Sequence, residues 1–257
     1  TMLFDTHAHY DDNKYDEDRY EVIQRAHESG VSYILNASSS PSSVYESIAL
    51  AEKFDFVYAA VGIHPHNAEE VTDKLLETLA ELSEHKKVVA IGEIGLDYYY
   101  DFSPRDIQQK WFAKQIQLAR EVGLPIIIHN RDSHEDVLRI MKNENAKSVG
   151  GILHCYSGSV EMAREILDNN FYISVGGPVT FKNARKVIEV VKYVPSDRLL
   201  IETDSPYLTP EPLRGKRNES SYVRYVAEKI AQIKGVDFEE IARATTENAK
   251  RLFKINQ

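Results

Sequence analysis

Six of the nine histidines in this chain stand in or directly after short apolar runs, where their side chains could bind a metal: His7, His9, His64, His66, His129 and His154. Two acidic residues have the same kind of position. Glu93 follows the apolar run Val88–Ile91, and Asp204 follows the run Leu199–Thr203. Imidazole nitrogens and carboxylate oxygens are common protein ligands of zinc and other divalent metals. This pattern points to metal-assisted chemistry.

The number of these candidates indicates more than one ion. Four histidines and two carboxylates are too many for one catalytic zinc, which takes about three protein ligands and a water. They suit two ions about 3.5–4 Å apart that share a carboxylate, an arrangement that activates water and holds a phosphate oxygen. Glu93, which comes from the middle strand of the set, is the expected bridge. Mixed nitrogen and oxygen ligands fit Zn, Mn, Co or Ni, and Mg with fewer imidazoles.

The apolar runs are short and rich in β-branched residues, which predicts buried strands. We expect strands at residues 3–8, 31–37, 56–62, 88–91, 125–128, 151–155, 171–175 and 199–203. In this assignment Glu93 lies at the C-terminal end of its strand. Between and after the strands we expect helices at residues 20–30, 41–53, 68–85, 104–122, 133–142, 159–168, 183–193, 221–234 and 238–253.

Eight strands that alternate with helices predict a parallel sheet. Eight is also the number that closes a barrel, so we predict an α/β fold with one (β/α)8 TIM-barrel domain over residues 1–257. An open, doubly wound sheet is the alternative. In a barrel the C-terminal ends of the strands meet on one face, where active sites are built. The fold would therefore bring the candidate ligands together.

Composition narrows the class of protein. The chain has 42% hydrophobic and 28% charged residues and a net charge of -9, so it is unlike a basic nucleic-acid coat protein and would hold a polyanion only locally. A single cysteine rules out an internal disulfide and favours the cytoplasm. The sequence offers no apolar run of the roughly 20 residues that a membrane helix needs. We expect no membrane partner and a monomer.

At six places the chain resembles the TatD-related metal-dependent deoxyribonucleases, in the order expected for that family and over nearly its whole length. The segments that carry the resemblance are Asp5–His9, Gly62–His66, Gly92–Tyr98, His129–Arg131, His154–Gly158 and Glu202–Leu208. The resemblance implies a barrel with a two-metal site that hydrolyses phosphodiester bonds at DNA ends.

The resemblance also implies a role for each ligand position. One ion would be held by His7, His9, Glu93 and Asp204, and the other by Glu93, His129 and His154. Glu93 and Asp204 would be catalytic, and Asp204 would take the proton of the attacking water. Related amidohydrolases often bridge their metals with a modified lysine after the fourth strand. Glu93 has that place here, which favours the nuclease type of site.

Three residues near these ligands are candidates for contacting the substrate. His64 and His66 follow the third predicted strand and could contact substrate or orient water. Arg131 could clamp a phosphate with two hydrogen bonds. A structural ion pair of Arg131 with Asp97 or Asp132 is the alternative.

A basic loop after the last strand is a further candidate. Residues 210–218 include Arg214 and Lys216, which we predict to contact phosphate; an ordinary solvated loop is the alternative. The tyrosines 98–100 could stack on unpaired bases, although core packing would explain them equally well.

The sequence leaves three classes of function open. The first is a deoxyribonuclease that removes nucleotides from DNA ends. The second keeps the same site but cleaves another bond, as an amidohydrolase or an esterase that deacylates aminoacyl-tRNA. The third is a metal-binding module without catalysis. The complete ligand set beside a candidate base favours an enzyme.

Overall fold

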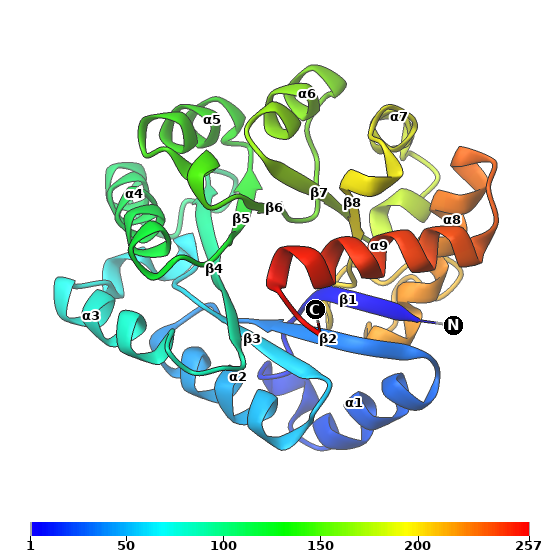
Figure 1. The fold of residues 1–257 in the computed structure, drawn as a ribbon, viewed down its shortest axis with the longest axis horizontal. Helices are drawn as coiled ribbons and strands as arrows, with labels where there is room; N and C mark the ends of the chain where they lie inside the picture. The colour runs from blue at the N-terminus through cyan, green and yellow to red at the C-terminus, as the bar shows by residue number, and fades with distance from the viewer. Residues whose placement is uncertain (1, 257) are drawn as a thin grey trace. The chain divides into compact units, whose positions relative to one another are not determined.

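The computed structural model describes residues 2–256 and contains eight strands. They are β1 (Leu3–Ala8), β2 (Val31–Ala37), β3 (Val57–Val61), β4 (Val88–Asp97), β5 (Ile126–Arg131), β6 (Gly151–Leu153), β7 (Phe171–Val175) and β8 (Leu199–Ile201). The strands belong to one sheet whose order follows the chain from β1 to β8. With the alternating helices, this confirms the predicted (β/α)8 barrel class (Figure 1).

The described residues form nine α-helices: α1 (Arg19–Glu28), α2 (Pro41–Lys53), α3 (Asp73–Leu82), α4 (Arg105–Val122), α5 (His134–Asn143), α6 (Val160–Asp168), α7 (Arg185–Tyr193), α8 (Val223–Lys234) and α9 (Phe238–Phe253). Short 3₁₀ helices lie at Asn13–Tyr15, Pro65–Glu70, Ala146–Ser148, Gly177–Thr180, Ser196–Arg198 and Ser220–Tyr222. Within residues 2–256 no helix has the length and hydropathy needed to cross a membrane.

The chain divides into two compact units. Unit 1 contains residues 1–36, 155–164 and 173–257, and unit 2 contains residues 37–154 and 165–172. The predicted domain of residues 1–257 also includes Thr1 and Gln257, which lie outside the described residues.

In unit 1, the C-terminal helix α9 covers the first strand (Figure 1). Phe4 of β1 is fully buried, and its ring centroid lies 5.9 Å from that of Phe253 at the end of α9. The start and the end of the chain are thus joined by apolar packing. This contact supports β1, which carries the first candidate ligands.

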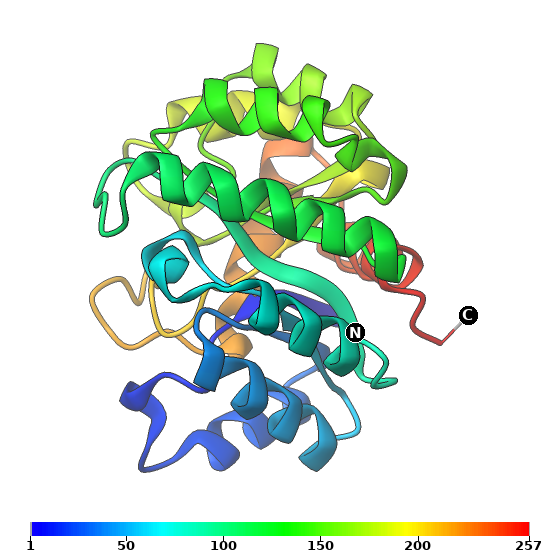
Figure 2. The same cartoon turned by 90° about the vertical axis from the view of Figure 1, so that its left-hand side faces the viewer.

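In unit 2, all ten residues of β4 are buried. Helix α4 packs on this strand, as the side view shows (Figure 2). Trp111, Phe112 and Ile116 recur on one face of α4, and each is at most 8% exposed. This spacing matches the helical period that aligns apolar side chains on one face. The helix therefore fixes the strand that carries Glu93.

The length of β4 corrects the sequence prediction, which ended this strand at Ile91. The strand continues to Asp97, so Glu93 lies in its middle and not at its end. Glycine does not stop the strand here because it permits close approach of the neighbouring backbone. Gly95 pairs with His129, and a Cβ atom on Gly95 would lie only 1.9 Å from the His129 carbonyl oxygen.

Local signals explain some of the helix boundaries. Ser40 caps α2, with its hydroxyl accepting a hydrogen bond from the Ser43 N–H (3.2 Å), and Gly123 ends α4 with a φ of 72°. The helix predicted over residues 68–85 is present but shorter, as α3 (Asp73–Leu82). The chain instead forms a 3₁₀ helix to Glu70 and begins α3 at Asp73, because the Thr72 hydroxyl provides a new N-cap.

Candidate metal centre

The first cluster of candidate ligands lies in unit 1, where the end of β1 meets the segment after β8. The Asp204 N–H donates to the His7 carbonyl (2.8 Å), and the His9 N–H donates to the Ser205 carbonyl (2.8 Å). A parallel bridge between Ala8 and Ser205 completes this pairing. Backbone hydrogen bonds therefore hold the two histidines beside Asp204, although they are far apart in the sequence.

The side chains of this cluster point to one place. Nε2 of His7 lies 3.1 Å from Nε2 of His9, and Oδ1 of Asp204 lies 3.2 Å from the His9 nitrogen and 3.6 Å from that of His7. Ligand atoms bound about 2.0–2.1 Å from one tetrahedral ion lie roughly 3.3 Å from one another. Two imidazole nitrogens and one carboxylate oxygen at these separations fit a divalent metal.

The buried carboxylate of Asp5 holds the segment that carries Asp204. Asp5 has no exposed surface and accepts hydrogen bonds from the Thr203 N–H (2.9 Å), the Thr203 hydroxyl (2.6 Å) and the Ser220 hydroxyl. Burial raises the pKa of Asp5 to about 7, against the lowering effect of these hydrogen bonds. Because Thr203 precedes Asp204, the network fixes the approach of Asp204 to β1.

The second cluster lies in unit 2 around one oxygen of Glu93. Oε2 of Glu93 lies 2.8 Å from Nδ1 of His129 and 3.1 Å from Nε2 of His154. Nε2 of His64 lies 3.6 Å from the same oxygen. Glu93 is only 2% exposed, and a carboxylate this deeply buried is costly unless it is neutralised. Imidazoles with a carboxylate in the middle are a donor set that suits a divalent metal.

The strand register accounts for this convergence. His129 pairs with Gly95 of β4, two residues beyond Glu93. The His154 N–H donates to the Ile128 carbonyl (3.0 Å), which places His154 beside β5, the strand that carries His129. The positions of both histidines are therefore set by the parallel pairing of neighbouring strands.

Asp97 connects this cluster to the loop after β4. Its Oδ2 atom lies 2.9 Å from Nε2 of His129 and 3.1 Å from Nε2 of His66. Its Oδ1 atom accepts hydrogen bonds from the N–H groups of Tyr99 (3.1 Å) and Tyr100 (2.9 Å). Burial acts to raise the pKa of Asp97, but the hydrogen bonds outweigh it and the pKa is lowered. Asp97 is therefore an anion that orients two imidazole rings.

The electrostatics of His129 follow from its two acidic neighbours. Burial acts to lower the pKa of His129, but hydrogen bonds with Asp97 and Glu93 outweigh it and raise the pKa. A ligating histidine commonly has its second ring nitrogen held by a carboxylate, which fixes the ring orientation. His129 has this arrangement, with Nδ1 toward Glu93 and Nε2 toward Asp97.

The predicted phosphate contacts have different environments. The Arg131 guanidinium lies over the rings of Tyr99 (4.0 Å) and Tyr100 (5.1 Å), while the carboxylate of Asp97 faces imidazoles. Among the described residues Arg131 makes no ion pair with Asp97 or Asp132, the two partners of the structural alternative. The phosphate contact itself stays a prediction.

The basic loop after β8 exposes two of its cations. Arg214 and Lys216 are exposed, and the Arg214 guanidinium lies 3.7 Å from the centre of the Phe181 ring. Arg217 instead makes two hydrogen bonds with Asp18 (2.9 and 2.7 Å). Arg217 therefore anchors the loop, whereas Arg214 and Lys216 face solvent.

Comparisons with known proteins decide the family. The model of the family described as TatD related DNase matches residues 4–254. The chain belongs to this family. It is 59% identical to the uncharacterized metal-dependent hydrolase YabD of Bacillus subtilis, over 99% of this chain and 100% of that protein. It is 33% identical to a protein of Erwinia tasmaniensis named 3'-5' ssDNA/RNA exonuclease TatD, over 98% and 100% of the two chains.

Solved structures agree with the TatD assignment. The crystal structure of YjjV, a TatD homolog from Escherichia coli K12, superimposes with a TM-score of 0.92 at 32% identity and covers 98% of each chain. The resemblance noted from the six sequence segments is confirmed. The protein is a metal-dependent hydrolase of the TatD family, and it contains residue clusters that suit metal ions.

Sequence reasoning assigned Asp97 no contact with the histidines of the TatD-family site. Its contacts with His66 and His129 depend on folding. The Nε2 atom of His64 lies 3.6 Å from Oε2 of Glu93, and the predicted contact of His64 with substrate or water stays a prediction. The available signal for Asp97 was its place four residues after Glu93, as a second carboxylate on the same buried strand.

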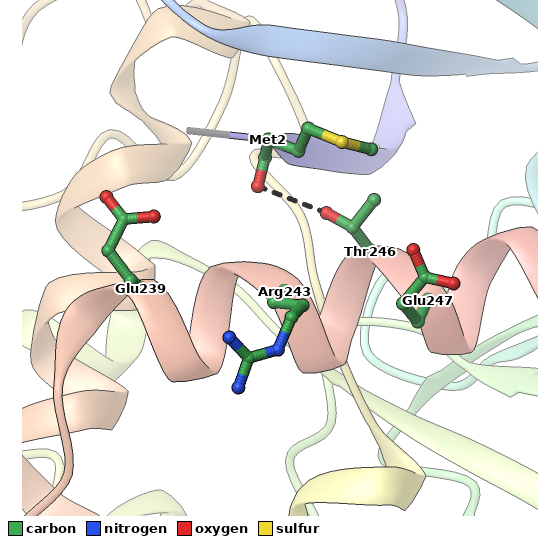
Figure 3. A pocket seen from close by; sticks show the side chains of 5 residues that line it. All are labelled: Met2, Glu239, Arg243, Thr246 and Glu247. Carbon is green, nitrogen blue, oxygen red and sulfur yellow. Dashed lines mark hydrogen bonds between the residues drawn. The ribbon is translucent and has the colours of Figure 1, made fainter.

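A surface hollow elsewhere in unit 1 carries none of the candidate ligands (Figure 3). It lies between Met2 and α9, and its other lining residues are Glu239, Arg243, Thr246 and Glu247. The Thr246 hydroxyl donates to the Met2 carbonyl (3.3 Å). Figure 3 shows the five lining side chains, four of them on α9, and no histidine is among them. The clusters around Glu93 and Asp204 are the candidate metal-binding clusters.

Proposed function

We propose that this TatD-family hydrolase is an exonuclease that uses two divalent ions to remove nucleotides from the ends of single-stranded DNA. The observation that carries the proposal is the convergence of imidazole nitrogens on Oε2 of Glu93. The relative named as an exonuclease for single-stranded DNA and RNA supports the substrate class and suggests 3'-5' polarity. Single-domain organisation, a monomeric state and a cytoplasmic location belong to the same proposal.

In this proposal each ion has its own ligands and Glu93 serves both. The ligands of one ion are His7, His9, Glu93 and Asp204, and those of the other are Glu93, His129 and His154. The separations among His7, His9 and Asp204, and those of Glu93 from His129 and His154, support these sets because they are close to those expected around one ion; the sharing of Glu93 is part of the proposal. Zn, Mn, Co, Ni and Mg are the candidate metals.

The residues of the chain would share the chemistry as follows. When bound, the metal ions would lower the pKa of the attacking water and stabilise the negative charge on the phosphoryl oxygen. Asp204 takes the proton of the attacking water on a carboxylate oxygen. Asp97 keeps the ring of His129 in its orientation through the 2.9 Å contact. His64 and His66 hold the water or the phosphate on the side of Glu93.

Phosphate recognition would be local, because the protein has a net charge of -9. Exposed cations near a site can hold a phosphate even in an acidic protein. Arg131 follows His129 by two residues, and Arg214 and Lys216 are exposed after β8. We assign these three side chains to the DNA backbone.

The test is release of nucleotides from single-stranded DNA labelled at either the 3' or the 5' end, with Mg²⁺, Mn²⁺ or EDTA. The Glu93→Ala variant removes the shared ligand, and Glu77→Ala on the exposed face of α3 is the matched control. We expect metal-dependent release by the wild type and the control, and none by Glu93→Ala. A Glu93→Ala protein that keeps full activity would contradict the proposal.

Lack of release by the wild type with every metal would also count against a nuclease. The remaining two-metal hypotheses, an amidohydrolase or an aminoacyl-tRNA deacylase, would then be tested on cyclic amides and aminoacyl esters. Metal binding without turnover of any substrate would favour a non-catalytic module.

A further inference from the structure

The loop after β4 exposes three aromatic rings, Tyr99, Tyr100 and Phe102, which we call the aromatic platform. They are 58%, 47% and 63% exposed. The rings of Tyr100 and Phe102 are stacked, with centroids 5.1 Å apart and planes inclined by 20°. Tyr99 meets Tyr100 edge-on at 4.9 Å. Phe102 has no polar group to favour this exposure, so a flat ligand would gain by covering it.

The neighbouring Tyr98 shows what a tyrosine with a structural role looks like in this loop. Its hydroxyl donates to Oδ2 of Asp136 (2.6 Å) and accepts a hydrogen bond from Gln109 (2.7 Å). The guanidinium of Arg105 covers its ring at 4.1 Å. Tyr98 is therefore fixed by polar contacts on its hydroxyl and its face. The platform rings are more exposed than the ring of Tyr98, although the Arg131 guanidinium lies over one face of Tyr99 at 4.0 Å.

The platform is attached to the metal-ligand cluster through Asp97. One carboxylate oxygen of Asp97 holds the N–H groups of Tyr99 and Tyr100, and the other holds Nε2 of His129. The ring of His66 also contacts the platform: its centroid lies 5.4 Å from that of Tyr100 and 4.8 Å from that of Phe102. A single side chain, that of Asp97, therefore connects the backbone of the platform to the candidate metal ligand His129.

We propose that the aromatic platform binds unpaired bases of a single-stranded nucleic acid by stacking, next to the bond that is cleaved. This inference rests on the proposed nuclease function and names how that site selects its substrate. Stacking suits any base, because every base has a flat aromatic face, and it is available only where bases are not paired. Arg131, which lies over Tyr99, adds a cation for the adjoining phosphate.

The charge of the protein strengthens the argument. A chain with a net charge of -9 gains little from general attraction to a polyanion, so contacts to the bases matter more. The same platform would exclude a duplex end, whose bases are already stacked and paired. The substrate class is therefore a single strand with free bases at its terminus.

The experiment uses the full-length protein with Tyr100→Leu and Phe102→Leu, which keep apolar bulk but remove the aromatic faces. Tyr45→Leu, at a tyrosine 56% exposed on α2, is the matched control. Each protein is assayed on an oligo-dT strand and on a strand of equal length with abasic sites at its terminal nucleotides. Calorimetric titration with Mn²⁺ measures the metal sites independently of any nucleic acid.

We expect each platform variant to raise KM for oligo-dT roughly tenfold, as loss of a stacked base does, with kcat little changed. On the abasic strand the variants and the wild type should have equal KM values, and Mn²⁺ affinity should be the same in all four proteins. Tyr45→Leu should match the wild type throughout.

Other outcomes separate the two proposals. If the wild type cleaves oligo-dT and the platform variants have its KM, stacking is wrong while the nuclease stands. Equal losses on the normal and the abasic strand would also overturn stacking. If the wild type binds Mn²⁺ but neither binds nor cleaves either strand, the nuclease proposal fails, and the platform proposal fails with it.

Discussion

Oδ2 of Asp97 lies 2.9 Å from Nε2 of His129, on the side of the ring opposite to Glu93. The ring therefore cannot turn without losing one of two contacts to a carboxylate. Because Asp97 is buried and its pKa is lowered, it is an anion at neutral pH. The ring nitrogen that faces Glu93 is thereby directed to the place where an ion would be bound.

The first prediction concerns this contact. Replacing Asp97 by Asn removes the negative charge but keeps the size of the side chain. We expect metal affinity to fall about 10- to 100-fold, as is usual when the carboxylate partner of a ligating histidine is lost. Isothermal titration with Mn²⁺ measures the change, and Asp106→Asn, at an exposed position on α4, is the control. Unchanged affinity in Asp97→Asn would show that His129 does not need this partner.

A second prediction concerns the number of ions. His9→Ala should remove a ligand of one ion only, and His129→Ala a ligand of the other. We expect metal analysis by mass spectrometry to find about two ions per wild-type chain and about one in each variant. Glu93→Ala should lower occupancy at both sites. A wild-type protein that holds a single ion, lost equally in both histidine variants, would contradict the two-ion proposal.

The sequence was sufficient to predict the fold and several side chains that the structure brings together, because both depend on local patterns. Strands β2 and β7 have the predicted boundaries. Each is an apolar run with turn residues on both sides, so its ends are marked in the local sequence. His7, His9 and Asp204 could be grouped because residues at the C-terminal ends of parallel strands share one end of the sheet.

The parts that were missed depend on contacts between distant residues. Ending β4 at Ile91 treated glycine as a stop, whereas Gly95 serves to let the backbone of His129 approach. The role of Asp97 becomes visible only when His66 and His129 are brought to it. Neither contact leaves a periodic signal in the sequence.

A third prediction concerns Asp5 as a positioning residue. Asp5→Asn keeps the shape but places an amide where Thr203 and Ser220 donate hydrogen bonds. Loss of hydrogen-bond acceptors in a buried network should lower the free energy of unfolding by about 1–3 kcal/mol. We also expect weaker binding at the His7 cluster, with binding at the Glu93 cluster unchanged. Urea unfolding and metal titration measure the two effects; equal weakening at both clusters would indicate general loss of structure instead.

The last prediction concerns the dependence of stability on pH. Glu219 is 6% exposed and accepts hydrogen bonds from Nε (2.8 Å) and Nη2 (2.7 Å) of Arg25. Burial acts to raise the pKa of Glu219, but the hydrogen bonds from Arg25 and Ser221 outweigh it and lower the pKa below its ordinary value of 4.5. A carboxyl group with a lowered pKa stabilises the folded state above its unfolded pKa, and this stabilisation is lost as pH falls through the folded pKa.

We therefore expect Glu219→Gln to lower the free energy of unfolding by about 1–2 kcal/mol at pH 7, since Arg25 is half exposed and its contribution is reduced by solvent. The difference from the wild type should shrink as pH is lowered below about 4.5, because the wild-type carboxyl group then also becomes neutral. Urea unfolding at pH 7, 5, 4 and 3 measures this trend. Glu228→Gln, which removes an exposed pair with Arg224, should cost only about 0.5 kcal/mol or less. A difference for Glu219→Gln that stays constant from pH 7 to pH 3 would mean that the ion pair with Arg25 does not stabilise the fold.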